Sequence, residues 1–223
     1  MTFKLFIEAI LKFLLGVLLV GLLLFLPAGT LNFPGGCLFM MLLFVPMFAA
    51  GLVMMIKNPA LLKKRLDARE KQSEQKDVIK LSGLMFLTGF ILAGLDFRFG
   101  WSRLPAWIPV AASVLFLLSY LVYAEVLREN AYLSRTIGVQ EGQKVVDTGL
   151  YAVVRHPMYA ATLILFLMIP LILGSFFSLI IFLAYPAVIV KRIKNEEQVL
   201  SRDLPGYAAY MQKVKYRLIP LIW

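Results

Sequence analysis

Four long apolar runs in the first 127 residues restrict the fold of this chain more than any other feature of its sequence. The runs cover residues 5–26, 37–56, 81–97 and 106–127. A helix rises roughly 1.5 Å per residue, so about 20 apolar residues cross a hydrocarbon core of roughly 30 Å. The N-terminal run exceeds the about 7–15 residues of a signal peptide's apolar region, and another run follows it closely. We therefore predict four membrane-spanning helices, the first of them retained rather than cleaved.

Two shorter apolar runs, at 157–173 and 176–190, are separated by Gly174-Ser175. Each would form a helix of roughly 23–26 Å, slightly short of the hydrocarbon core. They predict either two short spans or a hairpin that stops before the far face of the bilayer. The chain is 61% hydrophobic and only 16% charged, whereas soluble domains average about 25% charged. We expect an all-α integral membrane protein with a bundle of about five to six transmembrane helices, the last two a short helical hairpin.

The basic residues fall between the apolar runs in a pattern that sets the orientation. If the N-terminus is cytoplasmic, 21 of the 23 Lys and Arg residues lie on that side, and only Arg98 and Arg103 lie outside. Cytoplasmic loops of membrane proteins carry such an excess. We predict cytoplasmic N- and C-termini, and this topology explains the net charge of +10 better than a nucleic-acid partner does. The compact size and single cysteine favour a prokaryotic inner membrane.

The sequence lacks the motifs of several common classes of metal site, enzyme and transporter. Cys37 is the only cysteine and His156 the only histidine, which excludes an intrachain disulfide and disfavours a zinc or haem site. Neither GxGxxG nor GxxxxGKS/T occurs, which disfavours a Rossmann-type or P-loop enzyme. The few acidic residues of the spans lie near span ends, which argues against a proton-relay transporter. We predict no metal site.

Two polar segments remain as candidates for chemistry. They are GLYAVVRHPMY at 149–159 and RIKNEE at 192–197. The hairpin between them returns the chain to the cytoplasmic side, so both segments are expected there. Arg192 and Glu196 share a helix face at i,i+4; they form either a solvated ion pair or a site for an anionic and a cationic ligand group. His156 precedes Pro157 at a helix start and either bonds to backbone or lines a ligand pocket.

The C-terminal tail carries an apolar stripe of its own. Its members recur at steps of 7, 4, 3, 4 and 3: Ile193, Leu200, Leu204, Tyr207, Met211 and Val214. This spacing places them on one helical face, interrupted near Pro205-Gly206. We predict a C-terminal amphipathic cytoplasmic helix that lies on the membrane surface or packs over the His156 region as a lid.

The order of these segments resembles a known family. GLYAVVRHPMY, an apolar hairpin, RIKNEEQVL and LPGYAAYMQKVKYRLIPLIW follow one another in the layout of the isoprenylcysteine carboxyl methyltransferase family. Phospholipid N-methyltransferases share this C-terminal layout. The resemblance implies an enzyme that uses S-adenosyl-L-methionine without a Rossmann fold, with the cofactor on the cytoplasmic side. It divides the chain into four spans over 1–134 and a cofactor-binding catalytic region over 135–223.

The resemblance also implies roles for individual residues. Two are implied as catalytic: Glu196, which binds the amino group of the cofactor's methionine part, and Arg192, which orients the carboxylate of the acceptor. The implied cofactor pocket comprises Val145, Val146, Tyr151, His156, Pro157, Met158, Tyr159, Glu196 and Glu197. From the residues alone, Tyr151 and Tyr159 would equally fit an interfacial aromatic belt.

The expected function is a membrane methyltransferase that acts on an amphipathic acceptor, either a membrane lipid or a prenylated small molecule. Methyl transfer from a sulfonium needs positioning and desolvation more than acid–base help. A carboxylate acceptor is already ionised at neutral pH, whereas an amine must first be neutral, and His156 is the one candidate base. The alternatives are a phosphatidylethanolamine N-methyltransferase, a membrane reductase, for which no nicotinamide motif is found, and a non-catalytic scaffold or transporter subunit.

Overall fold

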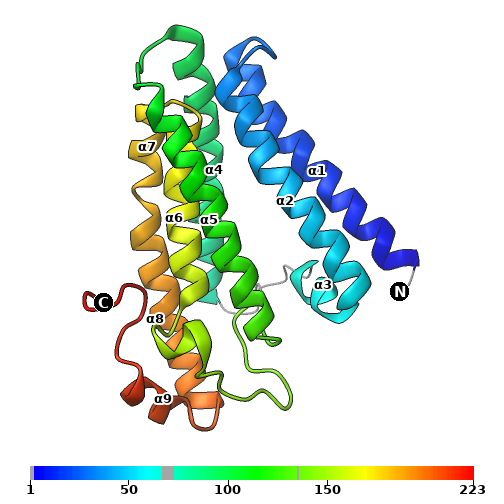
Figure 1. The fold of residues 1–223 in the computed structure, drawn as a ribbon, viewed down its shortest axis with the longest axis vertical. Coiled ribbons are helices and arrows are strands. Elements are labelled where there is room, and N and C mark those ends of the chain that lie inside the picture. Colours follow the sequence, from blue (N-terminus) through cyan, green and yellow to red (C-terminus); the bar gives the residue numbers. More distant parts are fainter. Residues whose placement is uncertain (1–2, 67–72, 135) are drawn as a thin grey trace.

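The computed structural model describes residues 3–66, 73–134 and 136–223, which form helices joined by loops (Figure 1). The N-terminal helices are α1 (Phe3–Ala28), α2 (Pro34–Lys57), α3 (Pro59–Leu66), α4 (Ser73–Phe99) and α5 (Trp107–Glu129). Within the described ranges, five helical stretches are long and apolar enough to cross a membrane: α1, α2, α4, α5 and a last one over Phe176–Asp203. The predicted all-α membrane bundle is confirmed.

The C-terminal hairpin consists of α6 (Pro157–Ile172), α7 (Phe176–Phe182) and α8 (Tyr185–Asp203). α6 is about 24 Å long, so it is the short arm, and α7 with α8 forms a longer returning arm. α7 and α8 are separate helices because Pro186 has no N–H to donate to the carbonyl of Phe182. The hairpin therefore combines one short apolar helix with one arm of membrane-spanning length.

Two helices extend beyond the spans that hydropathy predicts. α4 begins at Ser73, ahead of the span predicted at 81–97, and α8 continues to Asp203, past the run that ends at residue 190. Hydropathy marks where the apolar surface ends, but helical hydrogen bonding continues because Lys, Gln, Glu and Arg are good helix formers. Both helices thus carry polar turns beyond the apolar part of the bundle, and these turns supply side chains to the site.

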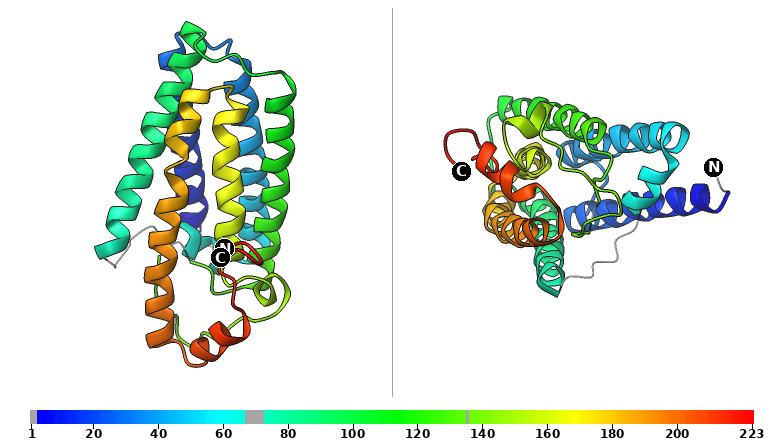
Figure 2. Two further views of the ribbon diagram at one scale, coloured as in Figure 1. Left: turned by 90° about the vertical axis from the view of Figure 1, so that its left-hand side faces the viewer. Right: turned by 90° about the horizontal axis from the view of Figure 1, so that it is seen from below.

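The helices lie side by side in a bundle (Figure 2). Its core combines aliphatic side chains with several phenylalanines, among them Phe39, Phe90, Phe116 and Phe182. α5 lies along α6, α1 along α4, and α4 against α7 and α8. Phe182 of α7 is fully buried and contacts the ring of Phe86 edge to face. At the end of α4, buried Asp96 accepts hydrogen bonds from the N–H and hydroxyl of Ser102 and from the hydroxyl of Ser175. These bonds tie the turn between α6 and α7 to α4.

The chain ends and the polar segments gather toward one end of the bundle. α3, α9, the start of α1, the residues 136–148 and the C-terminus lie in the lower half of Figure 1, away from the loop that joins α4 to α5. Assignment of this end to the cytoplasm stays a prediction from the basic residues. Three of those basic residues, Arg69, Lys71 and Arg135, lie outside the described residues.

The predicted C-terminal helix is divided in two. α8 ends at Asp203, Gly206 adopts a φ of +86°, and the chain reverses into α9 (Tyr207–Lys213). A residue in the left-handed region ends a helix, and glycine adopts that region without steric cost. Most of the apolar stripe is buried all the same. Leu204, Tyr207 and Val214 form a cluster with Tyr210, against which partly buried side chains pack: Val139, Val145, Leu200 and Met211.

Candidate functional site

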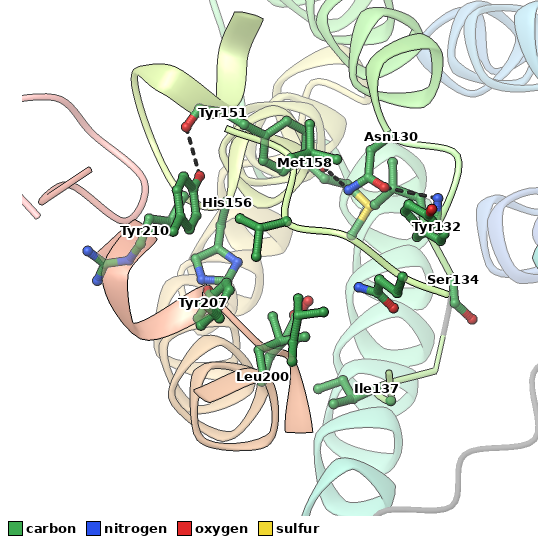
Figure 3. A pocket seen from close by; sticks show the side chains of 18 of the residues that line it. Asn130, Tyr132, Ser134, Ile137, Tyr151, His156, Met158, Leu200, Tyr207 and Tyr210 are labelled. Carbon is green, nitrogen blue, oxygen red and sulfur yellow. Dashed lines mark hydrogen bonds between the residues drawn. The ribbon is translucent and has the colours of Figure 1, made fainter. Parts of the chain in front are cut away.

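A cleft lies where the segment after α5, the start of α6, α8 and α9 come together (Figure 3). Its empty space is about 790 Å³, including the mouth that opens to solvent. Its walls come from residues between 130 and 146, between 151 and 159, and between 196 and 210. The two polar segments singled out in the sequence therefore meet at one site.

Most residues predicted for the cofactor pocket line this cleft: Val145, Val146, Tyr151, His156, Met158, Tyr159 and Glu196. The other two predicted pocket residues, Pro157 and Glu197, are not among the described residues of the lining, and neither is Arg192, which was predicted to orient the acceptor. Pro157 starts α6, Arg192 contacts the lining residue Tyr159, and Glu197 is buried beside His156. The structure thus brings Glu196 to the cleft and turns its neighbour Glu197 away.

Glu197 is the centre of a buried charged cluster next to the cleft. Arg155 donates from Nε to its Oε1 at 2.7 Å, and Arg217 donates from Nε to its Oε2 at 2.8 Å. Nε2 of His156 lies 3.3 Å from Oε1. A carboxylate with a guanidinium donor on each oxygen has little capacity left for a ligand. Its contacts instead hold Arg155 and His156 in place.

The segment after α9 holds the same part of the chain through its backbone. The N–H of Arg155 donates to the carbonyl of Tyr216 and that of His156 to the carbonyl of Arg217, both at 2.9 Å. Nη1 of Arg155 donates to two further carbonyls of this segment, at 2.7 and 2.9 Å. The wall that carries His156 is therefore held in place by the chain itself, which lowers the conformational cost of binding a ligand there.

The turn that leads into the His156 segment depends on Gly149. This residue has a φ of +54° and begins the 3₁₀ turn η1 (Gly149–Ala152). The N–H of Leu150 donates to the two carboxylate oxygens of Glu129, at 3.2 and 3.0 Å, and a Cβ at position 149 would overlap that carboxylate. Glycine is thus required here by backbone conformation and by close approach.

Gly149→Ala should lower the free energy of unfolding by about 2–3 kcal/mol, because left-handed backbone with a side chain costs roughly 1–2 kcal/mol and the methyl group displaces Glu129. Gly142→Ala is a matched control: its φ is +68°, but its Cβ would meet no atom within 4 Å. Denaturant titration of both variants in the same detergent measures the difference. If both variants lost the same free energy of unfolding, the clash with Glu129 would not contribute to the effect of Gly149→Ala.

Glu196 reaches the cleft from α8 and is joined to Arg192 through Tyr159. The hydroxyl of Tyr159 donates to Oε2 of Glu196 at 2.5 Å, and Nε of Arg192 donates to the same hydroxyl at 2.8 Å. Within the part of the chain that the structure describes, Oε1 of Glu196 receives no hydrogen bond. One carboxylate oxygen is therefore oriented by the protein, and the other can bind a donor in the cleft.

Arg192 is held from its other side by α4. Its Nη1 donates to Oε1 of Gln75 at 3.2 Å, and Nε2 of Gln75 donates to Oδ1 of Asn195 at 2.7 Å. Gln75 is fully buried, and the guanidinium of Arg192 lies over the ring of Tyr159, 5.7 Å from its centroid. The cation is thus fixed at the contact between α4 and α8, adjacent to the cleft wall.

The tyrosines of the cleft are hydrogen-bond donors at neutral pH. Burial raises the pKa of Tyr151, Tyr207 and Tyr210, so these phenols stay protonated. The hydroxyl of Tyr210 donates to the carbonyl of Tyr151 at 2.7 Å, a bond visible in Figure 3. Nδ2 of Asn130 donates to the hydroxyl of Tyr151 at 3.0 Å.

Several lining residues had no place in the site predicted from sequence: Asn130, Tyr132, Ile137, Leu200, Leu204, Tyr207 and Tyr210. The helical stripe of the tail identified Leu200, Leu204 and Tyr207 as a buried face, but their place at the cleft follows from the reversal at Gly206. Asn130 directly follows α5, where an asparagine is an ordinary helix-ending residue. Gln75 and Arg217 carry no local signal for their contacts.

Comparison with known proteins supports a function for this region. Residues 109–202 match the model of the isoprenylcysteine carboxyl methyltransferase (ICMT) family. This stretch contains α6, α7 and nearly all of α5 and α8, with Glu129, His156, Arg192 and Glu196, so the resemblance inferred from the sequence is confirmed there. The match supports a membrane methyltransferase of the isoprenylcysteine carboxyl methyltransferase type.

A curated relative is similar to part of the chain. The uncharacterized protein YpbQ of Bacillus subtilis (strain 168) is 30% identical over 96 residues, which cover 43% of this chain and 56% of YpbQ. The match therefore spans a little over half the length of that relative.

Proposed function

We propose that this protein is an integral membrane methyltransferase that binds S-adenosyl-L-methionine in the cleft and methylates an amphipathic, lipid-like acceptor. One observation carries the proposal. Glu196, in the family-matched stretch, has one oxygen held by Tyr159, and its other oxygen, which no described residue contacts by a hydrogen bond, can accept a donor at the cleft. A carboxylate so oriented is suited to the cationic amino group of the cofactor.

The remaining walls fit the other parts of this cofactor. Val145 and Val146 supply apolar surface, and Tyr151 and His156 supply aromatic rings, as an adenosine moiety requires. When bound, S-adenosyl-L-methionine supplies a methyl group activated by its sulfonium. The protein's contribution is to orient the reactants and to exclude water, because this transfer depends on alignment more than on proton transfer.

Arg192 is proposed to orient the acceptor. Its guanidinium lies beside Tyr159 and is positioned by Gln75 of α4, so an acceptor head group that reached Tyr159 from the bilayer would meet a fixed cation. A planar guanidinium pairs well with a carboxylate. This chemistry favours an ionised carboxylate over a phospholipid amine, and the proposed site lies at the cytoplasmic face.

The test is transfer of a tritiated methyl group from S-adenosyl-L-methionine by the purified protein in phospholipid nanodiscs. N-acetyl-S-farnesylcysteine and phosphatidylethanolamine are offered in parallel, with Glu196→Gln protein as the matched control. We expect label in the carboxylate acceptor that alkali releases as methanol, since esters hydrolyse and N-methyl groups do not. Alkali-stable label in phosphatidylethanolamine would support the N-methyltransferase instead. The absence of transfer to either acceptor would contradict both and leave a scaffold or transporter subunit.

A further inference from the structure

We propose that Tyr207 of α9 is a ligand-binding residue of the cleft, whose hydroxyl donates a hydrogen bond to the nucleoside part of the bound cofactor. This inference rests on the proposed function and adds to it a residue outside the matched stretch 109–202. Tyr207 is 4% exposed and lines the cleft. Its hydroxyl is buried and has no hydrogen-bond partner among the described residues.

Unlike Tyr207, the other tyrosines of the cleft have hydroxyls that are hydrogen-bonded within the protein. The hydroxyls of Tyr151, Tyr159 and Tyr210 are bonded to Asn130, Glu196 and the carbonyl of Tyr151, respectively. The hydroxyl of Tyr132 donates to the carbonyl of Gly142 at 3.1 Å. Buried hydroxyls in folded proteins are hydrogen-bonded with few exceptions. An unpartnered one at a cleft wall therefore indicates an acceptor that comes from outside the chain.

The backbone and the packing around Tyr207 hold its hydroxyl where no described residue bonds to it. Gly206, in the left-handed conformation, sets the start of α9, and the N–H of Tyr207 donates to the carbonyl of Leu204 at 3.2 Å. The ring contacts that of Tyr210, with centroids 5.6 Å apart, inside the apolar cluster of the tail. The hydroxyl thus lies at the cleft wall out of contact with solvent and without a bond to a described residue, which costs free energy in the ligand-free protein.

The charges near this hydroxyl indicate which kind of ligand group can accept its hydrogen bond. Burial raises the pKa of Tyr207, and the nearby carboxylates of Glu197 and Glu196 raise it further, so the phenol acts as a donor. The same negative charges disfavour a carboxylate acceptor at this point. A neutral acceptor fits better, and the nucleoside offers two kinds: ribose hydroxyls and adenine ring nitrogens. The cationic amino group is then left for Glu196.

Tyr207→Phe tests the inference, because it removes one oxygen atom and keeps the ring. The dissociation constants of S-adenosylhomocysteine and of 5′-methylthioadenosine, which lacks the amino acid part, are measured by titration calorimetry in detergent. We expect both ligands to bind about 2- to 12-fold more weakly, which corresponds to the loss of one hydrogen bond between neutral groups. The melting temperature of the ligand-free variant should be equal to or higher than that of the wild type, because no bond to a described residue is lost and a buried polar group is removed.

Tyr120→Phe is the matched control. Its hydroxyl lies on α5 and donates to the carbonyl of Leu43 at 3.1 Å, so this variant should melt lower and bind both ligands as the wild type does. Unchanged affinity in Tyr207→Phe would overturn the inference and leave the proposed function standing. If Tyr207→Phe bound S-adenosylhomocysteine more weakly but 5′-methylthioadenosine as the wild type does, the hydroxyl would not contact the nucleoside part. A lower melting temperature of ligand-free Tyr207→Phe would show that the hydroxyl has a partner in the chain. Failure of the wild type to bind either ligand would overturn both proposals.

Discussion

Replacement of Glu197 by glutamine should destabilise the protein by about 3–5 kcal/mol, the usual cost of leaving buried charges without their partner. Arg155 is 6% and Glu197 5% exposed, so water cannot replace the lost interaction. An amide has one acceptor oxygen, and its NH₂ group would face a guanidinium donor of either Arg155 or Arg217. Because the same cluster contacts His156, the wall of the cleft should loosen as well.

The prediction is checked by denaturant unfolding in detergent, with Asp147→Asn as the matched control. Asp147 also pairs with a cation, Lys213, at 2.7 Å, but both side chains are exposed. An exposed pair contributes little to stability, so this control should unfold close to the wild type. If Glu197→Gln unfolded at the wild-type denaturant concentration, the buried cluster would not have the structural role assigned to it.

Replacement of Glu196, one residue earlier, should give the opposite combination: normal stability and a loss of about 100-fold in affinity for S-adenosylhomocysteine. Glutamine retains an oxygen that can accept from the hydroxyl of Tyr159, so the fold keeps that contact. The negative charge proposed to hold the amino group is lost, and a hydrogen bond to a charged group is worth roughly 1.5–3 kcal/mol. Calorimetric titration measures the affinity, and thermal unfolding of the ligand-free protein measures the stability.

Glu125→Gln provides the control for a general effect of charge removal. Glu125 pairs with Arg128 on the exposed surface near the end of α5, and it does not contribute to the described lining of the cleft. It should leave the affinity unchanged. Wild-type affinity in Glu196→Gln would exclude Glu196 from the cofactor site, whereas reduced stability in that variant would indicate a structural role in place of a binding one.

The membrane spans follow from the sequence because they depend on local composition. Runs such as 5–26 and 106–127 must be helical in a bilayer, since only internal hydrogen bonding satisfies the backbone there. The ends of α4 and α8 could not be predicted in the same way. Beyond the membrane, Ser73–Lys80 and Lys191–Asp203 are polar in sequence, and their helical state depends on continuation of an existing helix and on contacts between the two helices.

The sequence predicted that two segments meet at the candidate site, but it did not predict which side chains contact one another there. Charge counting and the hairpin placed His156 and Glu196 on one side, and the structure places both at one cleft. The different surroundings of Glu196 and Glu197 depend on where Tyr159 and Arg217 lie. The contact of Gln75 with Asn195 joins residues 120 positions apart. No local pattern encodes such contacts, because they arise from the packing of whole helices.

The central claim is that this cleft binds S-adenosyl-L-methionine, and titration of S-adenosylhomocysteine into the purified wild-type protein tests it most directly. We predict a single saturable site with a dissociation constant in the micromolar range and no competition from ATP, whose triphosphate would meet Glu196. Saturable binding that Glu196→Gln weakens about 100-fold, the loss of a hydrogen bond to a charged group, would agree with the proposed site. No binding of S-adenosylhomocysteine at millimolar concentration to folded wild-type protein would contradict it.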